Sequence, residues 1–278
     1  MGQRCVMGVF AHPDDETFSM AGAFRRYHNQ GVRAALVCAT RGEAGEISDP
    51  AFATGQNLGQ IREQELREAC RVMGVDDLSF LNYRDGTLQD ADPIEATGRL
   101  VCQIRRLRPQ VIVTFAANGG YGHPDHMAIH RLTVAAFQQA ADPACYPEQI
   151  EEGLQPYAPQ KLFTVGFARS TMGALRDMAV AGGVSFSPGG AAATIPLEEM
   201  GTPDEELSAV VSLTDDEYEL KMRAMQSHRT QMNSDNPMNR LPAETIRAWL
   251  GAEQFVQVVP PRASSEGLDH DLFVGIMD

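Results

Sequence analysis

The chain of 278 residues is 43% hydrophobic, which is enough apolar material to bury one large core, or one core with a smaller appendage. Its formal net charge is −14 and its lysines and arginines are scattered, which argues against nucleic acid as a partner, because such a partner requires a basic patch. The N-terminal apolar run is too short for a secretion signal and no apolar stretch reaches the ~20 residues that span a bilayer, so we expect a cytoplasmic protein without a membrane partner.

Strand-like and helix-like segments alternate along the first part of the chain. Strands are predicted at residues 5–11, 32–39, 77–82, 111–115 and 161–168, and helices at residues 17–29, 60–73, 94–107 and 127–140. This alternation predicts an α/β fold with a doubly wound, mostly parallel, Rossmann-like sheet and helices on both faces.

The second part of the chain is less regular. A proline-rich irregular segment is expected at residues 142–159, a helix at 172–181, a loop at 182–190, and strands at 209–213 and 253–259. Thr214 and Glu217 have the spacing of a capping box, which predicts that a further helix begins directly after Thr214.

Two loops follow predicted strands. Residues 40–59 are polar and glycine-rich, so they can line a pocket at the edge of the sheet or form a solvated connection. Asp85 precedes Gly86 after the third strand, and this pair is what a tight turn favours, so spacing alone does not make Asp85 functional.

Cysteines are spread singly through the chain, without the C-x-x-C spacing of a zinc or redox motif. They are Cys5, Cys38, Cys70, Cys102 and Cys145. An odd number of isolated cysteines, mostly inside apolar segments, predicts reduced and buried side chains.

A first chemical motif, Ala11-His12-Pro13-Asp14-Asp15-Glu16, lies at the turn between the first strand and the first helix. Ligands collect at the carboxyl ends of the strands in an open parallel sheet. Three acids and a histidine so close together are costly to desolvate unless a cation neutralises them. The motif therefore predicts a metal site.

A second motif, Gly122-His123-Pro124-Asp125-His126, follows the fourth strand and runs into the next predicted helix. If the strands are parallel and joined by the usual crossovers, both motifs emerge at one edge of the sheet. We therefore expect them to converge.

A catalytic zinc site needs about three ligands from His, Asp, Glu or Cys, and an open position for water. His12 and Asp15 can point to one side, and either His123 or His126 can complete the ligand set. Asp14 lies between the first two ligands and can accept a proton from the attacking water.

The histidine that does not bind the metal can act as an imidazolium. In that form it stabilises the oxyanion of a tetrahedral intermediate and protonates a leaving amine. Asp125 can orient this histidine and raise its pKa, and Tyr121 offers a second oxyanion donor. Together these groups predict metal-assisted hydrolysis of an amide.

The two motifs resemble those of the LmbE-like, or PIG-L, superfamily of zinc-dependent N-deacetylases. This superfamily includes the deacetylases of mycothiol and bacillithiol synthesis, chitin-oligosaccharide deacetylases and the enzyme that acts on N-acetylglucosaminyl-phosphatidylinositol. The resemblance covers the chain to about residue 140 and is looser beyond it. It implies that His12, Asp15 and His126 are the zinc ligands, with Asp14 as general base and His123 as charged partner of the intermediate.

Further site residues follow from the same resemblance. Asp125 would support His123, and Tyr121 is similar to the oxyanion tyrosine of the mycothiol-type members. The loop at residues 41–46 resembles the segment after strand two in the thiol-pathway members. Four residues would contact substrate, the last two through a His-x-x-Gln element: Arg62, Asp85, His228 and Gln231.

We therefore expect a hydrolase with one Zn²⁺ per chain, for which Fe²⁺ or Co²⁺ are alternative occupants. Its substrate would be a small N-acetylglucosamine-containing molecule that loses an N-acyl group, in the simplest case acetyl. Residues 1–168 are expected to form the α/β metal-hydrolase core, and residues 169–278 to complete the same domain as an extension that lines the pocket. A homo-oligomer is compatible with the sequence.

Three alternatives were weighed. An amidase of thiol S-conjugates would use the same site with a larger acyl pocket. A non-catalytic, metal-dependent sugar-binding protein would have no need of Asp14 and His123. A metallophosphoesterase needs ligands for two metals about 4 Å apart, and the sequence offers enough for one. The favoured hypothesis requires ring nitrogens of His12 and His126 to lie within about 5 Å of each other, since Zn–N bonds are near 2 Å.

Overall fold

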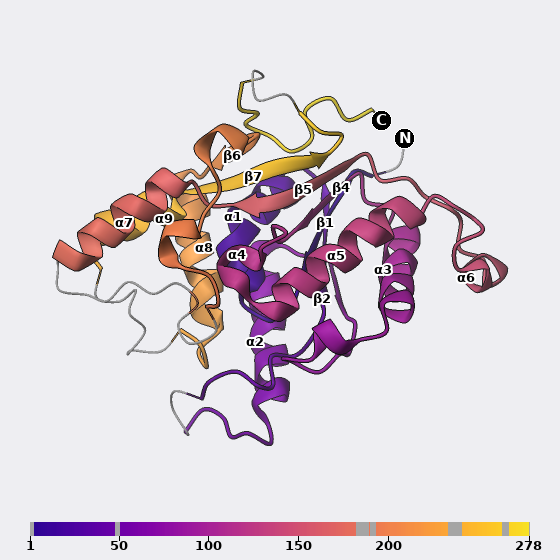
Figure 1. The fold of residues 1–278 in the computed structure, drawn as a ribbon, viewed down its shortest axis with the longest axis horizontal. Coiled ribbons are helices and arrows are strands. Elements are labelled where there is room, and N and C mark those ends of the chain that lie inside the picture. Colours follow the sequence, from indigo (N-terminus) through magenta and orange to yellow (C-terminus); the bar gives the residue numbers. More distant parts are fainter. Residues whose placement is uncertain are drawn as a thin grey trace.

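The chain folds around one seven-stranded sheet of order β3-β2-β1-β4-β5-β7-β6 (Figure 1). This computed structural model describes residues 3–47, 51–181, 189, 193–232, 241–262 and 267–277. The strands are β1 (Cys5–Phe10), β2 (Arg33–Cys38), β3 (Asp77–Phe80), β4 (Val111–Thr114), β5 (Lys161–Gly166), β6 (Ala209–Ser212) and β7 (Ala252–Val259).

Strands β1 to β5 pair in parallel, whereas β7 runs antiparallel to both β5 and β6. The predicted mostly parallel sheet is therefore confirmed. All residues of β1 and β4 are buried, as expected for central strands covered on both faces. Because β6 and β7 continue the sheet beyond β5, both predicted parts of the chain contribute to it.

Helices cover both faces of the sheet, which is the predicted doubly wound arrangement. The helices are α1 (Asp15–Asn29), α2 (Leu58–Met73), α3 (Pro93–Leu107), α4 (Gly119–Gly122), α5 (Pro124–Gln139), α6 (Pro147–Glu151), α7 (Arg169–Ala181), α8 (Asp215–Ser227) and α9 (Ala243–Leu250). Helix α8 packs against α1 and α2, and α3 packs against α5. Since the strand order reverses direction at β1, right-handed crossovers place α3 and α5 on the face opposite α1 and α2. None of the described helices is long and apolar enough to cross a membrane.

The predicted elements of the first part are present, with shifted ends. Helix α2 begins at Leu58 and α5 at Pro124, earlier than predicted. Pro124 suits the first position of a helix, because its ring fixes φ and its missing N–H would have no partner there. Asp125 and His126 therefore lie in the first turn of α5 and not in the preceding loop.

Sequence periodicity missed the short helices. Helix α6 lies inside the segment predicted to be irregular, and α4 and α9 were not predicted. The capping box of Thr214 and Glu217 is confirmed at the start of α8. The loop predicted at residues 182–190 lies outside the described residues, apart from Gly189. The five cysteines are free, and three of them, Cys5, Cys38 and Cys70, are buried.

Helix α1 is divided near its first turn by a buried ion pair. Met20 has non-helical angles, with φ −155° and ψ 27°. The Glu253 carboxylate of β7 accepts the N–H groups of Gly22 and Ala23 at 2.9 and 2.7 Å, as a cap would. Lys221 of α8 donates to Glu253 at 2.8 Å, and also to the carbonyl of Phe18 at 2.9 Å. A separate short helical piece, residues 15–19, therefore carries the last two residues of the first motif, Asp15 and Glu16.

Replacing Glu253 with alanine is expected to destabilise the fold strongly. The change leaves the Lys221 ammonium, 1% exposed, without its anion and two helix N–H groups without an acceptor. We expect the free energy of unfolding to fall by about 3–5 kcal/mol, measured by urea denaturation. Glu68→Ala is the control, because the exposed Glu68–Arg71 pair contributes only about 0–1 kcal/mol. Equal losses for the two variants would contradict this account of the buried pair.

Candidate active site

The two motifs meet at the carboxyl edge of the sheet. β1 and β4 are adjacent and parallel, so the turn after β1 and the loop after β4 leave the sheet on the same side. The first turn carries His12 to Asp15, and the second loop leads through α4 to His126. The predicted convergence of the motifs follows directly from this strand order.

Donor atoms of three residues, two imidazole nitrogens and the carboxylate oxygens of Asp15, form a triangle of nearly equal edges. Nδ1 of His12 lies 3.3 Å from Nε2 of His126 and 3.5 Å from Oδ2 of Asp15. Nε2 of His126 lies 3.4 Å from Oδ1 of Asp15. Ligands of a tetrahedral zinc ion, with bonds near 2.0–2.1 Å, are separated by about 3.3–3.5 Å. These three residues therefore fit one divalent ion, and the required proximity of His12 and His126 is met.

Hydrogen bonds set the orientation of both imidazoles. Nε2 of His12 lies 3.0 Å from Oδ1 of Asp85 and 3.3 Å from Oδ2 of Asp125, which makes Nε2 a donor and leaves the lone pair on Nδ1. Nδ1 of His126 lies 3.1 Å from the carbonyl of Gly119, which can only accept, so the lone pair is on Nε2. Both lone pairs thus belong to the nitrogens of the triangle, as in sites where outer carboxylates orient metal-bound histidines.

Other donor sets in the described chain are close as well. Two sets lie within 4.8 Å: His12, His123 and His126, and His12, Asp85 and Asp125. The second set uses the hydrogen-bonding nitrogen of His12. In addition, Asp125 is fully buried and accepts the N–H groups of Gly86 and Leu88 at 2.8 and 3.0 Å. That set is therefore already satisfied by hydrogen bonds.

Electrostatics couple the charges of the triangle. Burial disfavours the charged form of His12, but hydrogen bonds to Asp125, Asp15 and Asp85 outweigh burial and raise its pKa. Burial would likewise raise the pKa of Asp15, but His126 and His12 lower it well below its usual range. Without an ion, positive charge on imidazole balances the negative charge of the carboxylates. A divalent cation can take over this role.

Asp14 directly precedes Asp15 of the triangle in the chain and has a strained backbone conformation, with φ 107°. Its carboxylate contacts Nη2 of Arg62 at 3.3 Å and is 22% exposed, so it is within reach of solvent. Burial raises the pKa of Asp14 to about 6, while Arg62 opposes this shift. A carboxylate with this affinity for protons suits the predicted general base.

His123 occupies a different position from the one predicted. Its Nδ1 accepts the main-chain N–H of Asp125 at 3.2 Å and caps α5. Burial, followed by the neighbouring His12 and His126, lowers the pKa of His123 to about 4. The predicted imidazolium is therefore corrected to a neutral ring that carries its proton on Nε2, because Nδ1 is an acceptor.

The predicted support of His123 by the Asp125 carboxylate stays a prediction: the charge of Asp125 opposes the lowering of the His123 pKa, but the carboxylate makes its hydrogen bonds elsewhere. Because α5 begins at Pro124, the Asp125 side chain turns toward residues 86–88 and His12. Its contact with His123 is made by the main chain. In the described structure the carboxylate therefore orients His12.

Tyr121 lies over the histidines, with ring centroids 5.1 Å from His126 and 6.0 Å from His123. Burial raises the pKa of its phenol well above the usual value, so the hydroxyl remains a donor. Thr194 donates from its main chain to the carbonyl of Tyr121 at 3.0 Å, and from its hydroxyl to that of Gly122 at 2.7 Å. A segment from the second part of the chain thus packs against this loop.

The four predicted substrate contacts lie at different depths. Arg62 is 3% exposed and donates to the carbonyls of Gly42 and Pro13, so it lies beneath Asp14. Asp85 orients His12, as described above. His228 is fully buried, which corrects its predicted contact with substrate. Gln231 is partly exposed and donates to the carbonyl of Glu46 at 3.3 Å, beside the loop after β2.

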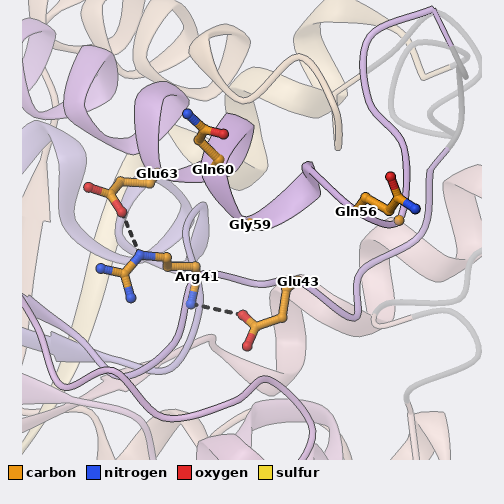
Figure 2. A pocket seen from close by; sticks show the side chains of 7 residues that line it. Arg41, Glu43, Gln56, Gly59, Gln60 and Glu63 are labelled. Atoms are coloured by element: carbon orange, nitrogen blue, oxygen red, sulfur yellow. Dashed lines mark hydrogen bonds and ion pairs between the residues drawn. The ribbon is translucent and has the colours of Figure 1, made fainter.

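That loop borders a polar pocket of about 350 Å³ (Figure 2). Its lining residues are Arg41, Glu43, Gly55, Gln56, Gly59, Gln60 and Glu63. Glu43 also accepts the N–H of Asp85 at 3.1 Å. The pocket is thus one hydrogen bond away from the residue that orients His12.

Two residues near the metal triangle were not singled out from the sequence. Phe115 stacks on His126 with ring centroids 3.8 Å apart and an interplanar angle of 5°. Glu16, although part of the first motif, received no role; it is buried and accepts the N–H of Asp14. Phe115 ends an apolar run, so only the three-dimensional structure distinguishes it from a core residue.

An α/β sheet that brings two histidines and an aspartate to the spacing of one divalent ion is an arrangement typical of metal-dependent hydrolases. The family model described as "PIG-L: GlcNAc-PI de-N-acetylase" matches residues 7–137. A 1D-myo-inositol 2-acetamido-2-deoxy-alpha-D-glucopyranoside deacetylase of Streptomyces avermitilis is 33% identical over 98% of this chain and 97% of its own. The chain therefore belongs to the PIG-L family.

Other relatives share this architecture. The mycothiol S-conjugate amidase of Streptomyces coelicolor is 31% identical over 99% of this chain and 98% of its own. The structure of N,N'-diacetylchitobiose deacetylase from Pyrococcus horikoshii superposes with a TM-score of 0.68 at 21% identity, covering 99% of this chain and 86% of that one. The predicted family and fold class are confirmed, and the named activities of these relatives are hydrolyses of a C–N bond.

The variant Asp125→Asn tests whether the Asp125 carboxylate acts on His12 or on His123. If its carboxylate orients His12, the variant should weaken zinc binding about 10–100-fold, as losses of outer carboxylates do. The measurement is a competition titration of the metal-free protein with a chelating dye. Asp90→Asn, in an exposed turn, is the control. If the variant keeps its zinc affinity but has a lower kcat, the carboxylate acts through His123, as the sequence predicts.

Proposed function

We propose that the protein is a zinc-dependent hydrolase that removes the acetyl group from an N-acetylglucosamine-containing small molecule. The observation that carries this proposal is the triangle of His12, Asp15 and His126, which Asp14 directly adjoins in the chain. The relatives named as deacetylases of an inositol glycoside support the substrate class. Zinc suits two imidazoles and one carboxylate, with Fe²⁺ or Co²⁺ as alternatives.

The three residues of the triangle would hold the ion. When bound, the ion would lower the pKa of water and polarise the acyl carbonyl. Asp14 accepts a proton from the attacking water, whose oxygen bonds to the carbonyl carbon. The C–N bond then breaks, and Asp14 returns the proton to the leaving nitrogen. The products are acetate and a free amine.

The oxyanion formed during this attack requires donors. Nε2–H of the neutral His123 and the hydroxyl of Tyr121 are the available groups, and neither loses its proton near neutral pH. Residues 1–168 would supply the metal-binding core, while residues 169–278 complete the domain and support the pocket. The hydrogen bonds of Thr194 to the Tyr121 loop favour this division of roles.

A second candidate is hydrolysis of a thiol S-conjugate amide. The specific support is the amidase from Streptomyces coelicolor, which covers nearly the whole chain. Both reactions break an amide at the same ion and differ in the size of the acyl group. Substrate competition therefore separates them.

The first experiment compares substrates. The zinc-loaded protein is incubated with N-acetylglucosaminyl inositol, N-acetylglucosaminyl malate, N,N'-diacetylchitobiose and a mycothiol S-conjugate, and the released amine is quantified. We expect the inositol glycoside to give the highest kcat/KM. Faster cleavage of the S-conjugate would favour the amidase, and no amine from any of the four would refute both functions.

The variant Asp14→Asn tests the role of Asp14 as general base, and removal of the metal tests whether the reaction requires the ion. Removing a general base should lower kcat by about 10²–10⁴-fold, while the zinc content stays at one ion per chain. Dialysis against a chelator should abolish amine release, and added Zn²⁺ should restore it. A zinc-loaded Asp14→Asn protein with wild-type kcat would show that another group takes the proton.

A further inference from the structure

Glu16 and His228 form a buried pair that the proposed chemistry does not use. Nε2 of His228 lies 2.8 Å from Oε1 of Glu16, and the two side chains are 0% and 1% exposed. Burial disfavours the charged form of His228, but the Glu16 carboxylate outweighs burial and raises its pKa. A buried carboxylate is costly without such a partner.

The second oxygen of Glu16 holds the main chain of Asp14. Oε2 of Glu16 accepts the N–H of Asp14 at 3.0 Å. Asp14 has φ 107°, a conformation that a non-glycine residue keeps only where its surroundings enforce it. One carboxylate thus links a histidine from α8 to the strained backbone of the proposed base.

The position of His228 is itself fixed from a third helix. His228 ends α8, and Thr230 follows it by two residues. Glu65 of α2 accepts the main-chain N–H of Thr230 at 2.9 Å and its hydroxyl at 2.7 Å. Arg62, three residues before Glu65, contacts the Asp14 carboxylate. Helix α2 therefore holds both the side chain of Asp14 and the segment that carries His228.

We propose that Glu16 and His228 are positioning residues that fix the main chain of Asp14 so that its carboxylate faces the metal triangle. This inference rests on the proposed role of Asp14 as general base. His228 acts through Glu16 and does not touch substrate. Loss of His228 leaves Oε1 of the buried Glu16 carboxylate without its donor, so the side chain is free to turn and its hydrogen bond to the N–H of Asp14 weakens.

His228→Leu and His228→Gln form the central comparison. Leucine fills the space without a donor, whereas the amide of glutamine can replace the Nε2 donor toward Glu16. We expect His228→Leu to lower kcat about 10–100-fold with unchanged KM and zinc affinity, as for other residues that orient a site through hydrogen bonds. His228→Gln should recover most of kcat. Val211→Ala, in the buried core of the outer strand β6, controls for lost stability, because it should lower Tm without changing kcat.

The double variant Asp14→Asn/His228→Leu gives the second test. If His228 acts only through Asp14, the double variant should be no slower than Asp14→Asn alone. If His228→Leu lowers the kcat of the Asp14→Asn variant by the same factor as it lowers the kcat of the wild type, the proposal is overturned. A raised KM with unchanged kcat in the single variant His228→Leu would also overturn it, since that result marks a substrate contact.

Failure of the positioning role is distinguishable from failure of the proposed function. An inactive Asp14→Asn together with a fully active His228→Leu would refute only the positioning role. A fully active Asp14→Asn would refute the general base and, with it, the inference that depends on Asp14.

Discussion

The parallel pairing of β1 with β4 is the constraint on which the site depends. It sends two turns, separated by more than a hundred residues, out of the sheet at one edge, where His12 and His126 meet at 3.3 Å. A one-residue slip in either strand would turn alternate side chains to the other face and move both motifs apart. The fully buried apolar residues of β1 and β4 specify the register, so the core sets the geometry of the metal triangle.

Each of two buried carboxylates in this molecule accepts hydrogen bonds from several donors. Asp125 satisfies two main-chain N–H groups and His12 at once, and Glu253 does the same for Gly22, Ala23 and Lys221. Each carboxylate thereby replaces the hydration it loses with several donors, which is what makes such burial tolerable. The consequence is rigidity, because displacing one member leaves several polar groups without partners.

The sequence was sufficient for the fold class and for the convergence of His12, Asp15 and His126, but not for the side chains that surround them. The assignment of these three residues as metal ligands stays a prediction. The alternation of strands and helices indicates the fold class, and the residues of the two motifs indicate the place of the site. Both are local features of the sequence. The hydrogen-bond partners of Asp125 could not be predicted because they depend on where α5 begins, and the start at Pro124 turns the Asp125 carboxylate toward His12. His228 was placed at the substrate because burial by α1, α2 and α8 leaves no local trace in the sequence.

Two helix N-termini face the site, since α1 begins at Asp15 and α5 at Pro124. The partial positive charge of a helix N-terminus favours carboxylates and opposes a cation. The acids at these termini reverse that preference: Asp15 opens α1, and Asp125 lies in the first turn of α5. Helix ends that suit anions can thus fit a divalent ion, because each terminus carries a carboxylate and neutral imidazoles contribute lone pairs without adding charge.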